Sequence, residues 1–289
     1  MEIENAIRHY LQVIHSMIKD TSTPILKNCT YVNWLEYPGY IMMHRHDNMA
    51  EVTLIVHGKG QYAVNNHIYD VKVGDVILSG AGVVHDAFMQ EREHYGTLTI
   101  QVEDLQMPGC APGQFLPRDQ IPVFHLPKQY PELRRQMSEI RELFGTENAE
   151  YREACQKKAE TVLGLVAAMI QDSGRPAQKV DSFCLEIEEY INEHYAEELS
   201  LESVAAAFYI STFHLSHLFK KETGYNFKQY LVRMRIGEAQ KIFLDDERAR
   251  IADVAQRVGY EDASYFSRAF QKETGMSPKE YKNYISVMR

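Results

Sequence analysis

The chain has 289 residues, a formal net charge of −9 at pH 7 and four cysteines. This length predicts about two domains. Cys29, Cys110, Cys155 and Cys184 form no Cys-x2-Cys pair, which excludes a disulfide framework and a thiolate metal site. The sequence has no run of about 18 apolar residues and no long apolar segment near its start, so we expect a cytoplasmic protein without a membrane partner.

The first predicted element is an amphipathic helix over residues 1–24, whose apolar residues share one face: Ile7, Leu11, Ile14 and Ile18. Over residues 25–105 the period of the apolar residues changes to two, within a domain predicted over residues 25–127. Short apolar runs alternate there with turns rich in Gly and Asn. Many short strands with such turns predict a small β-barrel or sandwich.

Two glycine-flanked motifs inside this region carry candidate ligands. The first is Gly39-x4-His44-x-His46-x4-Glu51-x6-Gly58, and the second is Gly74-x5-Gly80-x-Gly82-x2-His85. His44 and His46 would share one face of a strand, because they stand at i and i+2. Three imidazoles and one carboxylate that converge in a barrel can hold a divalent ion, such as zinc, manganese, iron or nickel.

Together these motifs resemble the two cupin motifs, although Gly80 and Met89 stand where the family pattern has proline and asparagine. All four ligand types of that pattern are present. Two other interpretations stay open: the same residues could line a pocket for an organic effector, or they could be structural histidines. Aromatic residues near the expected barrel mouth suit a sugar, although they suit core packing more often: Tyr31, Trp34, Tyr37, Tyr40 and Tyr62.

Two apolar stripes of helical period then predict a helical hairpin over residues 128–172. The stripes consist of Leu133, Met137, Ile140 and Phe144, and of Cys155, Ala159, Val162, Val166 and Met169. Either both helices cover the barrel, or one of them pairs with its twin in a homodimer, which is the interpretation we favour. A polar segment with Gly and Pro predicts a linker over residues 173–182.

The last domain, residues 183–289, contains one helical pattern twice. A shift of 51 positions places Phe219 on Phe270 and Gly224 on Gly275. Each copy begins at a good N-cap residue, Ser211 or Asp262, and follows an alanine-rich helix after a short turn. This pattern is typical of a helix-turn-helix, whose second helix enters the major groove of DNA. From residue 199 onward there are 14 basic and 11 acidic residues, so a mildly basic module is attached to an acidic body.

Between the copies, residues 226–244 predict one helix of about 28 Å, a plausible strut between two recognition helices that read successive major grooves about 34 Å apart. Residues 187–284 resemble the AraC/XylS family of transcription regulators. The resemblance rests on many positions in order: Ile236-x2-Ala239, Ile251-x2-Val254-Ala255, Gly259-Tyr260-x-Asp262, Ser264-Tyr265-Phe266-Ser267-Arg268, Phe270 and Gly275-x-Ser277-Pro278-x2-Tyr281.

We expect the exposed face of each recognition helix to contact DNA. Arg268 can bond guanine O6 and N7 together, whereas His217, where the family often has arginine, can make only one bond. Phe213 could pack on a thymine methyl, and the lysines would contact phosphates. The candidate DNA-binding residues are Thr212, Phe213, Ser216, His217, Lys220, Lys221, Ala263, Ser264, Ser267, Arg268, Gln271 and Lys272.

The predicted fold class is therefore α+β in two domains, with a cupin-like barrel and helical hairpin followed by an all-α double helix-turn-helix. The predicted function is a DNA-binding regulator controlled by a small-molecule effector, and the resemblance favours an activator that works with RNA polymerase. The alternative is a metal-dependent cupin enzyme with a DNA-binding regulatory tail. A third class, a constitutive DNA-architecture protein, would need no pocket.

Overall fold

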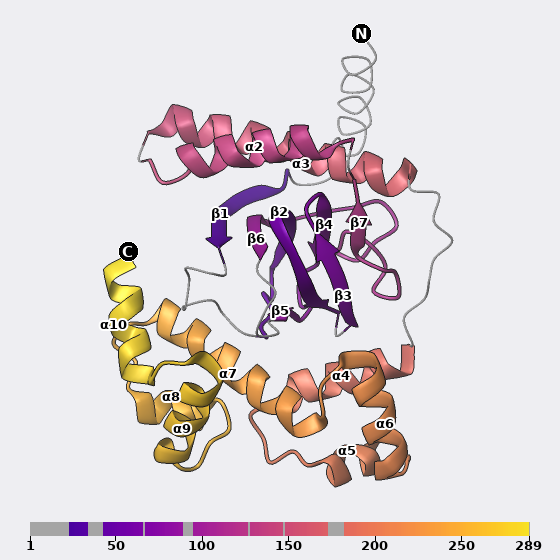
Figure 1. Ribbon diagram of the computed structural model, residues 1–289, viewed down its shortest axis with the longest axis vertical. Coiled ribbons are helices and arrows are strands. Elements are labelled where there is room, and N and C mark those ends of the chain that lie inside the picture. Colours follow the sequence, from indigo (N-terminus) through magenta and orange to yellow (C-terminus); the bar gives the residue numbers. More distant parts are fainter. Residues whose placement is uncertain are drawn as a thin grey trace.

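A strand-rich N-terminal domain and a helical C-terminal domain make up the protein (Figure 1). The computed structural model describes residues 23–33, 43–65, 67–88, 95–126, 128–146, 148–172 and 182–288. The helix predicted over residues 1–24 lies outside the described residues except for its last two positions. The linker predicted over residues 173–182 lies outside them except for its last position.

The strands are held together by one long strand, β2. The strand bounds are β1 (Ile25–Asn33), β2 (Met49–Val64), β3 (His67–Lys72), β4 (Asp75–Ser79), β5 (His85–Phe88), β6 (Tyr95–Glu103) and β7 (Val123–His125). The first half of β2 pairs with β4 and β6, and its second half pairs with β3 and β5. The register shifts between Ile55 and His57, next to Gly58 at φ +70°. This irregularity lets one strand serve two groups of partners.

A closed barrel is not confirmed. Among the described strands, pairing runs in the order β1-β6-β2-β4-β7, with β3 and β5 both attached to β2, so the path ends at β1 and β7. The two-domain α+β class is correct. The strand-rich domain is better described as an open sheet with β2 at its centre. Its last strand, the short β7, pairs with β4 alone in this path.

Helices α2 (Tyr130–Leu143) and α3 (Ala149–Asp172) cover the side of the sheet that faces away from the C-terminal domain (Figure 1). Their predicted stripes are buried: Leu133, Met137 and Ile140 of α2, and Cys155, Ala159, Val162, Val166 and Met169 of α3, pack in one cluster with sheet residues such as Val52 and Ile100. Phe144 packs at the edge of this cluster. These stripes therefore cover the sheet, and the sequence argument for dimerisation through them is not confirmed.

The C-terminal domain consists of two similar units joined by one helix. The helix bounds are α4 (Ser182–His194), α5 (Leu201–Ala207), α6 (Thr212–Thr223), α7 (Phe227–Asp245), α8 (Ile251–Arg257), α9 (Ala263–Thr274) and α10 (Pro278–Met288). We refer to α5 and α6 as the first unit and to α8 and α9 as the second unit. Figure 1 shows α7 running between them.

The predicted caps explain where α6 and α9 begin and end. Ser211 accepts a hydrogen bond from the His214 backbone N–H, and Asp262 accepts one from Ser264. Gly224 and Gly275 close these helices at φ +73° and +76°, which is the left-handed conformation that glycine adopts at low cost. Both helices therefore have the bounds that their sequence copies predict.

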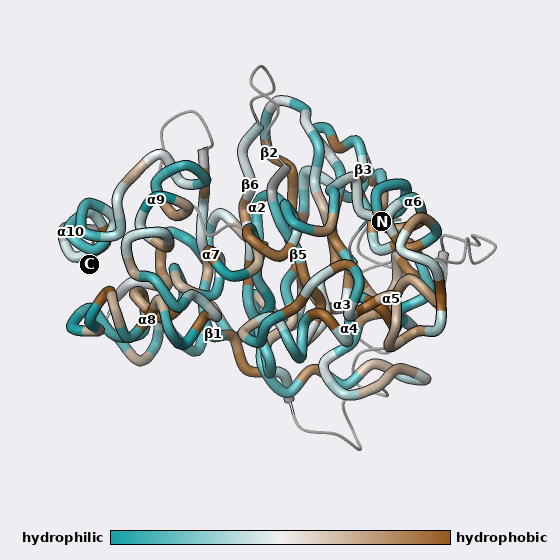
Figure 2. The backbone as a smooth tube through the Cα atoms, turned by 90° about the horizontal axis from the view of Figure 1, so that it is seen from below, coloured by the Kyte–Doolittle hydropathy of each residue, from teal (hydrophilic) through white to brown (hydrophobic). Residues whose placement is uncertain are grey.

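Each unit has its own apolar cluster, and α7 contributes to both. Its first half packs in the first cluster through residues such as Tyr230 and Met234. Its second half packs in the second cluster through Ile236, Ala239 and Phe243. Figure 2 shows the most hydrophobic strand segments near the middle of the molecule. No helix within the described ranges is long and apolar enough to cross a membrane.

Candidate effector site and DNA-binding face

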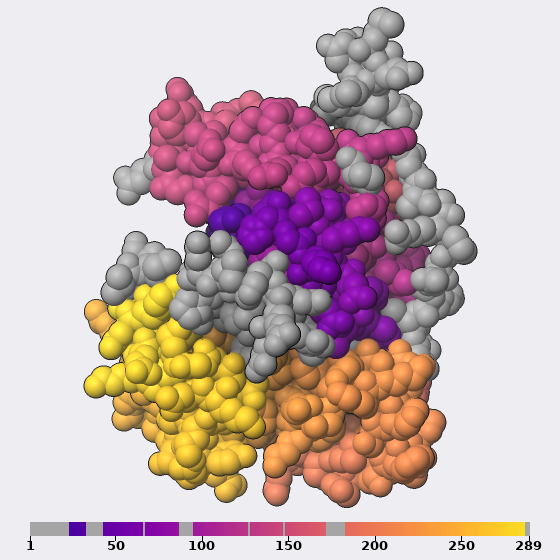
Figure 3. All heavy atoms as spheres, viewed as in Figure 1, coloured from indigo at the N-terminus to yellow at the C-terminus, as the bar shows by residue number. Residues whose placement is uncertain are grey.

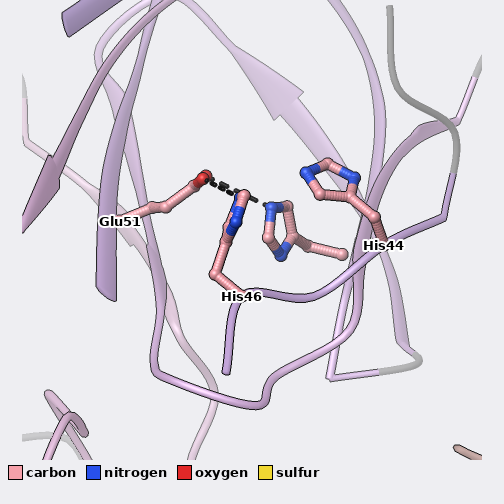
Figure 4. Close-up of side chains that lie close together, drawn as sticks. His44, His46 and Glu51 are labelled. Carbon is pink, nitrogen blue, oxygen red and sulfur yellow. Dashed lines mark ion pairs between the residues drawn. The ribbon is translucent and has the colours of Figure 1, made fainter. Parts of the chain in front are cut away.

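The structure brings His44, His46, Glu51 and His85 together. One ligand atom from each lies within 4.8 Å of the others. Figure 4 shows the labelled side chains of His44 and His46, from one segment, beside that of Glu51. Glu51 is the third residue of β2 and His85 the first of β5, and both are buried, with exposed fractions of 5% and 3%.

Backbone pairing explains this convergence. His44 forms an isolated antiparallel bridge with His85, in which each backbone N–H donates to the other residue's carbonyl, at 3.1 and 2.9 Å. The Gly82 N–H donates to the His46 carbonyl at 2.7 Å. The sequence argument that His44 and His46 lie on one regular strand is therefore wrong in detail: a short bridged segment, not a strand, positions the two rings.

Electrostatics in the cluster centre on the Glu51 carboxylate. Burial alone would raise its pKa, but His85 and His46 outweigh burial and hold the pKa well below its usual value. The His46 Nε2 lies 2.8 Å from Glu51 Oε1, and Gln101 donates to the same oxygen at 2.5 Å. Burial lowers the pKa of His85, yet Glu51 more than reverses this, so that pKa is raised. The carboxylate is thus ionised within a ring of nitrogen atoms.

The His85 ring has the orientation of a metal ligand. Its Nδ1 lies 3.1 Å from the Val83 carbonyl, which can accept a hydrogen bond from Nδ1–H, so that Nε2 is the ring nitrogen that faces Glu51. Nε2 lies 3.2 Å from Glu51 Oε2, yet this contact lacks the alignment of a hydrogen bond, and Nε2 has no such partner among the described residues. A buried imidazole nitrogen that faces a carboxylate oxygen, with two more imidazoles beside it, fits a divalent cation that would take the place of a proton between them.

Of the aromatic residues considered for a sugar site, the structure describes two, Tyr31 and Tyr62. Tyr62 is buried in an apolar cluster with Ile55 and Tyr95, and Tyr31 on β1 is 45% exposed. Trp34, Tyr37 and Tyr40 lie outside the described residues.

The recognition helices α6 and α9 expose the faces that the sequence predicts. Leu215 and Phe219 are buried on one side of α6, whereas Phe213 on its other side is 81% exposed. In α9, Phe266 and Phe270 are buried. Most candidate residues are exposed: Thr212, Phe213, Ser216, His217, Lys220, Lys221, Ser264, Arg268, Gln271 and Lys272.

Two candidates are less available for DNA than predicted. Ala263 is half-buried against the second cluster. Ser267 is half-buried, and its hydroxyl donates to the Ala263 carbonyl at 2.8 Å. Arg268 lies above the Tyr265 ring, with 5.9 Å between the guanidinium carbon and the ring centroid. Because the Tyr265 ring is itself exposed, the Arg268 guanidinium that stacks on it extends from the helix and is not enclosed.

Comparison with known protein families supports the two-part organisation. Residues 35–164 match a family described as an AraC-like ligand binding domain, and residues 204–284 match one described as a helix-turn-helix domain. The chain belongs to the AraC family of transcriptional regulators.

Individual relatives agree with the family. The chain is 40% identical over 118 residues to the uncharacterized HTH-type transcriptional regulator YijO of Escherichia coli K12, a match that covers 41% of this chain and 40% of YijO. It is 24% identical to the uncharacterized regulator YdiP of the same organism, over 83% of this chain and 80% of YdiP. It is also 24% identical to the HTH-type transcriptional activator RhaS of Enterobacter sp. strain 638, over 83% and 86% of the two chains. These relatives are regulators rather than enzymes.

The structure of this AraC-family chain also reveals residues that sequence reasoning missed. Gln101 on β6 contacts Glu51, and its place among apolar residues in the strand was the available signal. Asp86 follows the candidate ligand His85 and bonds Arg233 of α7, which is 147 positions away in the chain. No local pattern indicates that contact. Tyr209, in the turn of the first unit, is 97% exposed at φ +55°.

Proposed function

We propose that this AraC-family protein is a sequence-specific, effector-controlled transcription activator. The observation that carries the proposal is the pair of recognition helices, α6 and α9, with open outer faces on opposite ends of α7. Two such helices joined by one shared helix suit two successive major grooves. The activator role is supported by the relative RhaS, whose name describes an activator.

DNA selection by the full-length chain tests this proposal. We expect enrichment of a site with two conserved segments roughly one helical turn apart, and a steep loss of affinity as salt rises. Arg268 should read guanine through its two-pronged guanidinium. Failure to enrich any sequence, with binding equal for all duplexes, would reject sequence-specific recognition and leave a DNA-coating role.

We propose further that His44, His46, Glu51 and His85 form the effector site and hold one divalent metal ion. The donor set of three imidazole nitrogens and one carboxylate is typical of zinc, manganese, iron or nickel. Such an ion would present open coordination positions to oxygen atoms of an organic effector. Gln101 and the Val83 carbonyl would orient the ligands from outside.

Metal analysis of the purified chain tests this part. We expect about one zinc or manganese ion per chain after incubation and dialysis, and a loss larger than about 10–100-fold in Zn²⁺ affinity in Glu51→Gln or His85→Gln. His125→Gln is the matched control, because His125 pairs with Asp75 at 2.6 Å outside the cluster. Equal metal content in all variants would show that the ion binds elsewhere. A metal-free, folded wild type would leave the cluster as a binding site for an organic effector alone.

Two partners of the chain are also proposed. We propose a homodimer, since two copies would extend DNA recognition across two half-sites, but the dimer cannot use the buried stripes of α2 and α3. Light scattering at micromolar concentration measures the mass directly, and a monomer would reject the proposal. Contact with RNA polymerase follows from an activator role and is tested by transcription in a purified system.

A further inference from the structure

The strongest unassigned feature is a charged contact between the two domains, centred on Arg233. Arg233 lies in the first half of α7. Its Nη2 and Nε donate to Asp86 Oδ2 of β5 at 2.7 and 3.1 Å. The Asp86 side chain is fully buried, and that of Arg233 is 15% exposed. A buried pair of this kind is costly to leave half-made, because either charge alone would lack compensation.

Arg233 also reaches both helix-turn-helix units. Its Nη1 lies 3.5 Å from Glu273 Oε2 near the end of α9. Its guanidinium stands over the Tyr225 ring, just after α6, at 5.3 Å from the centroid, and the Tyr225 hydroxyl donates to the same Asp86 oxygen at 3.4 Å. One side chain therefore contacts the N-terminal domain, the end of the first recognition helix and the end of the second.

The rest of the domain interface holds α6 and α7 at the same place. His67 of β3 lies 2.9 Å from Glu222 of α6. The side chain of Ile68 lies so close to Gly224 that a Cβ there would stand 2.2 Å away from it. Met43 and Val84 of the N-terminal domain are buried in the first unit's own apolar cluster. Figure 3 shows the orange first unit directly against the purple sheet.

The effector site is one residue away from this contact. Successive side chains of a strand point to opposite faces, so His85 faces the ligand cluster while its neighbour Asp86 faces α7. Met43 of the interface likewise precedes His44 in the bridged segment. A displacement of β5 or of this segment at the site must also move Asp86 or Met43 at the interface.

We propose that Arg233 is a positioning residue that couples the effector site to the relative placement of α6 and α9. This inference rests on the proposed function, because it assumes that both helices read DNA together. Through Asp86, the N-terminal domain sets where Arg233 holds α7, and through Glu273 and Tyr225 this determines the spacing between the recognition helices. The effector then acts by changing which DNA spacing the protein accepts.

The test compares the affinity of the full-length protein for DNA sites that differ in the spacing between their two segments. The probes are the site selected by the wild type and the same site with one or two base pairs inserted between its segments. The variants are Asp86→Asn, Arg233→Gln and Arg233→Lys, each checked for a wild-type circular dichroism spectrum. Lysine keeps the charge, but one ammonium group lacks the fork that bonds Asp86 and Glu273 together. Glu189→Gln is the matched control, since it removes the exposed interdomain pair with Arg118 at 3.1 Å.

We expect the ratio of affinities for the selected and the altered spacings to fall by about fivefold or more in all three variants, which is the lower end of typical coupling between sites. Glu189→Gln should keep the wild-type ratio. The decisive variant is Asp86→Asn, because it lies outside the C-terminal domain. An equal loss of affinity at every spacing would show a structural role only and overturn the coupling. Unchanged discrimination in Asp86→Asn would overturn it as well. Failure of the wild type to select any site would instead refute the proposed function, so the two failures are distinct.

Discussion

The two helix-turn-helix units have nearly the same backbone but different surroundings. In both, the turn makes the equivalent hydrogen bond: the Ile210 N–H donates to the Ala205 carbonyl at 3.0 Å in the first unit, and the Tyr260 N–H donates to the Ala255 carbonyl at 2.9 Å in the second. The first unit lies against the N-terminal domain through Glu222 and Tyr225. The second carries the exposed arginine, Arg268, at the position where the first has His217.

This difference suggests a division of labour between two copies of one motif. A bidentate arginine specifies a base, whereas a histidine makes a single bond. We therefore expect the first unit to read sequence less stringently, and the first unit is also the one that lies against the N-terminal domain. We infer that the second unit supplies specificity and the first unit supplies control, and the following substitutions test that division.

The largest effect is expected for Arg268→Ala. Loss of the guanidinium should weaken the free energy of DNA binding by about 1–3 kcal/mol through one base pair of the selected site, and it should relax the base preference at that position. His217→Ala should cost less, because only one bond to a base edge is lost. Competition binding to single-base variants measures both. An equal loss on every DNA sequence would mean that Arg268 contacts phosphate alone, and the comparison between the units would fail.

Gly259→Ala should lower the free energy of unfolding of the C-terminal domain by about 1–2 kcal/mol or more, because the left-handed conformation is unfavourable by that amount for a residue with a Cβ. Gly259 has φ +87°, and a Cβ there would stand 2.7 Å from the Ala196 carbonyl oxygen. The free energy of unfolding in urea, followed by circular dichroism, gives the change. A loss below about 0.5 kcal/mol would indicate that the turn relaxes freely.

Ser211→Ala removes the N-cap of the first recognition helix and should lower the free energy of unfolding by about 1 kcal/mol. The hydroxyl accepts the His214 N–H at 3.1 Å. Ser211→Asp is the control, because aspartate is an equally good N-cap and already serves in the second unit. If both variants destabilise alike, the cap bond contributes little and other contacts fix the start of α6.

The smallest effect should come from Tyr209→Gly, and its sign should be opposite. Tyr209 occupies the turn position of Gly259 but at φ +55° with a 97% exposed ring. Glycine relieves the left-handed strain but adds entropy to the unfolded chain, for a net gain of roughly 0.5 kcal/mol. A loss of stability in the same urea measurement would show that the tyrosine ring makes a stabilising contact. A loss of DNA affinity alone would place that contact on DNA.

Local signals explain why the C-terminal domain could be predicted in detail. Caps such as Ser211 and Asp262, and the C-terminal glycines Gly224 and Gly275, act within a few residues of the helices that they bound. The four-residue cluster was predictable for a different reason: His44, His46, Glu51 and His85 are chemically distinctive and follow a known spacing, so their convergence did not depend on the exact strand arrangement.

Other contacts between distant segments were not predictable. The apolar stripes of α2 and α3 show only that one face of each helix is buried, and Leu133 or Val162 would look the same against a sheet or against a second copy. The sheet ends at β7, a strand of only three residues. The Asp86–Arg233 pair joins positions 147 apart, and neither residue carries a pattern that names its partner.

The shared helix α7 has a consequence for how the C-terminal domain unfolds. Its first half completes one apolar cluster and its second half completes the other. If either unit melted, α7 would lose packing partners, and the other unit depends on α7. Unfolding of one unit alone is therefore unfavourable, and the two units should melt in a single cooperative transition. The protein would then lose both recognition helices together, and a chain with only one functional DNA-reading unit would never accumulate as temperature rises.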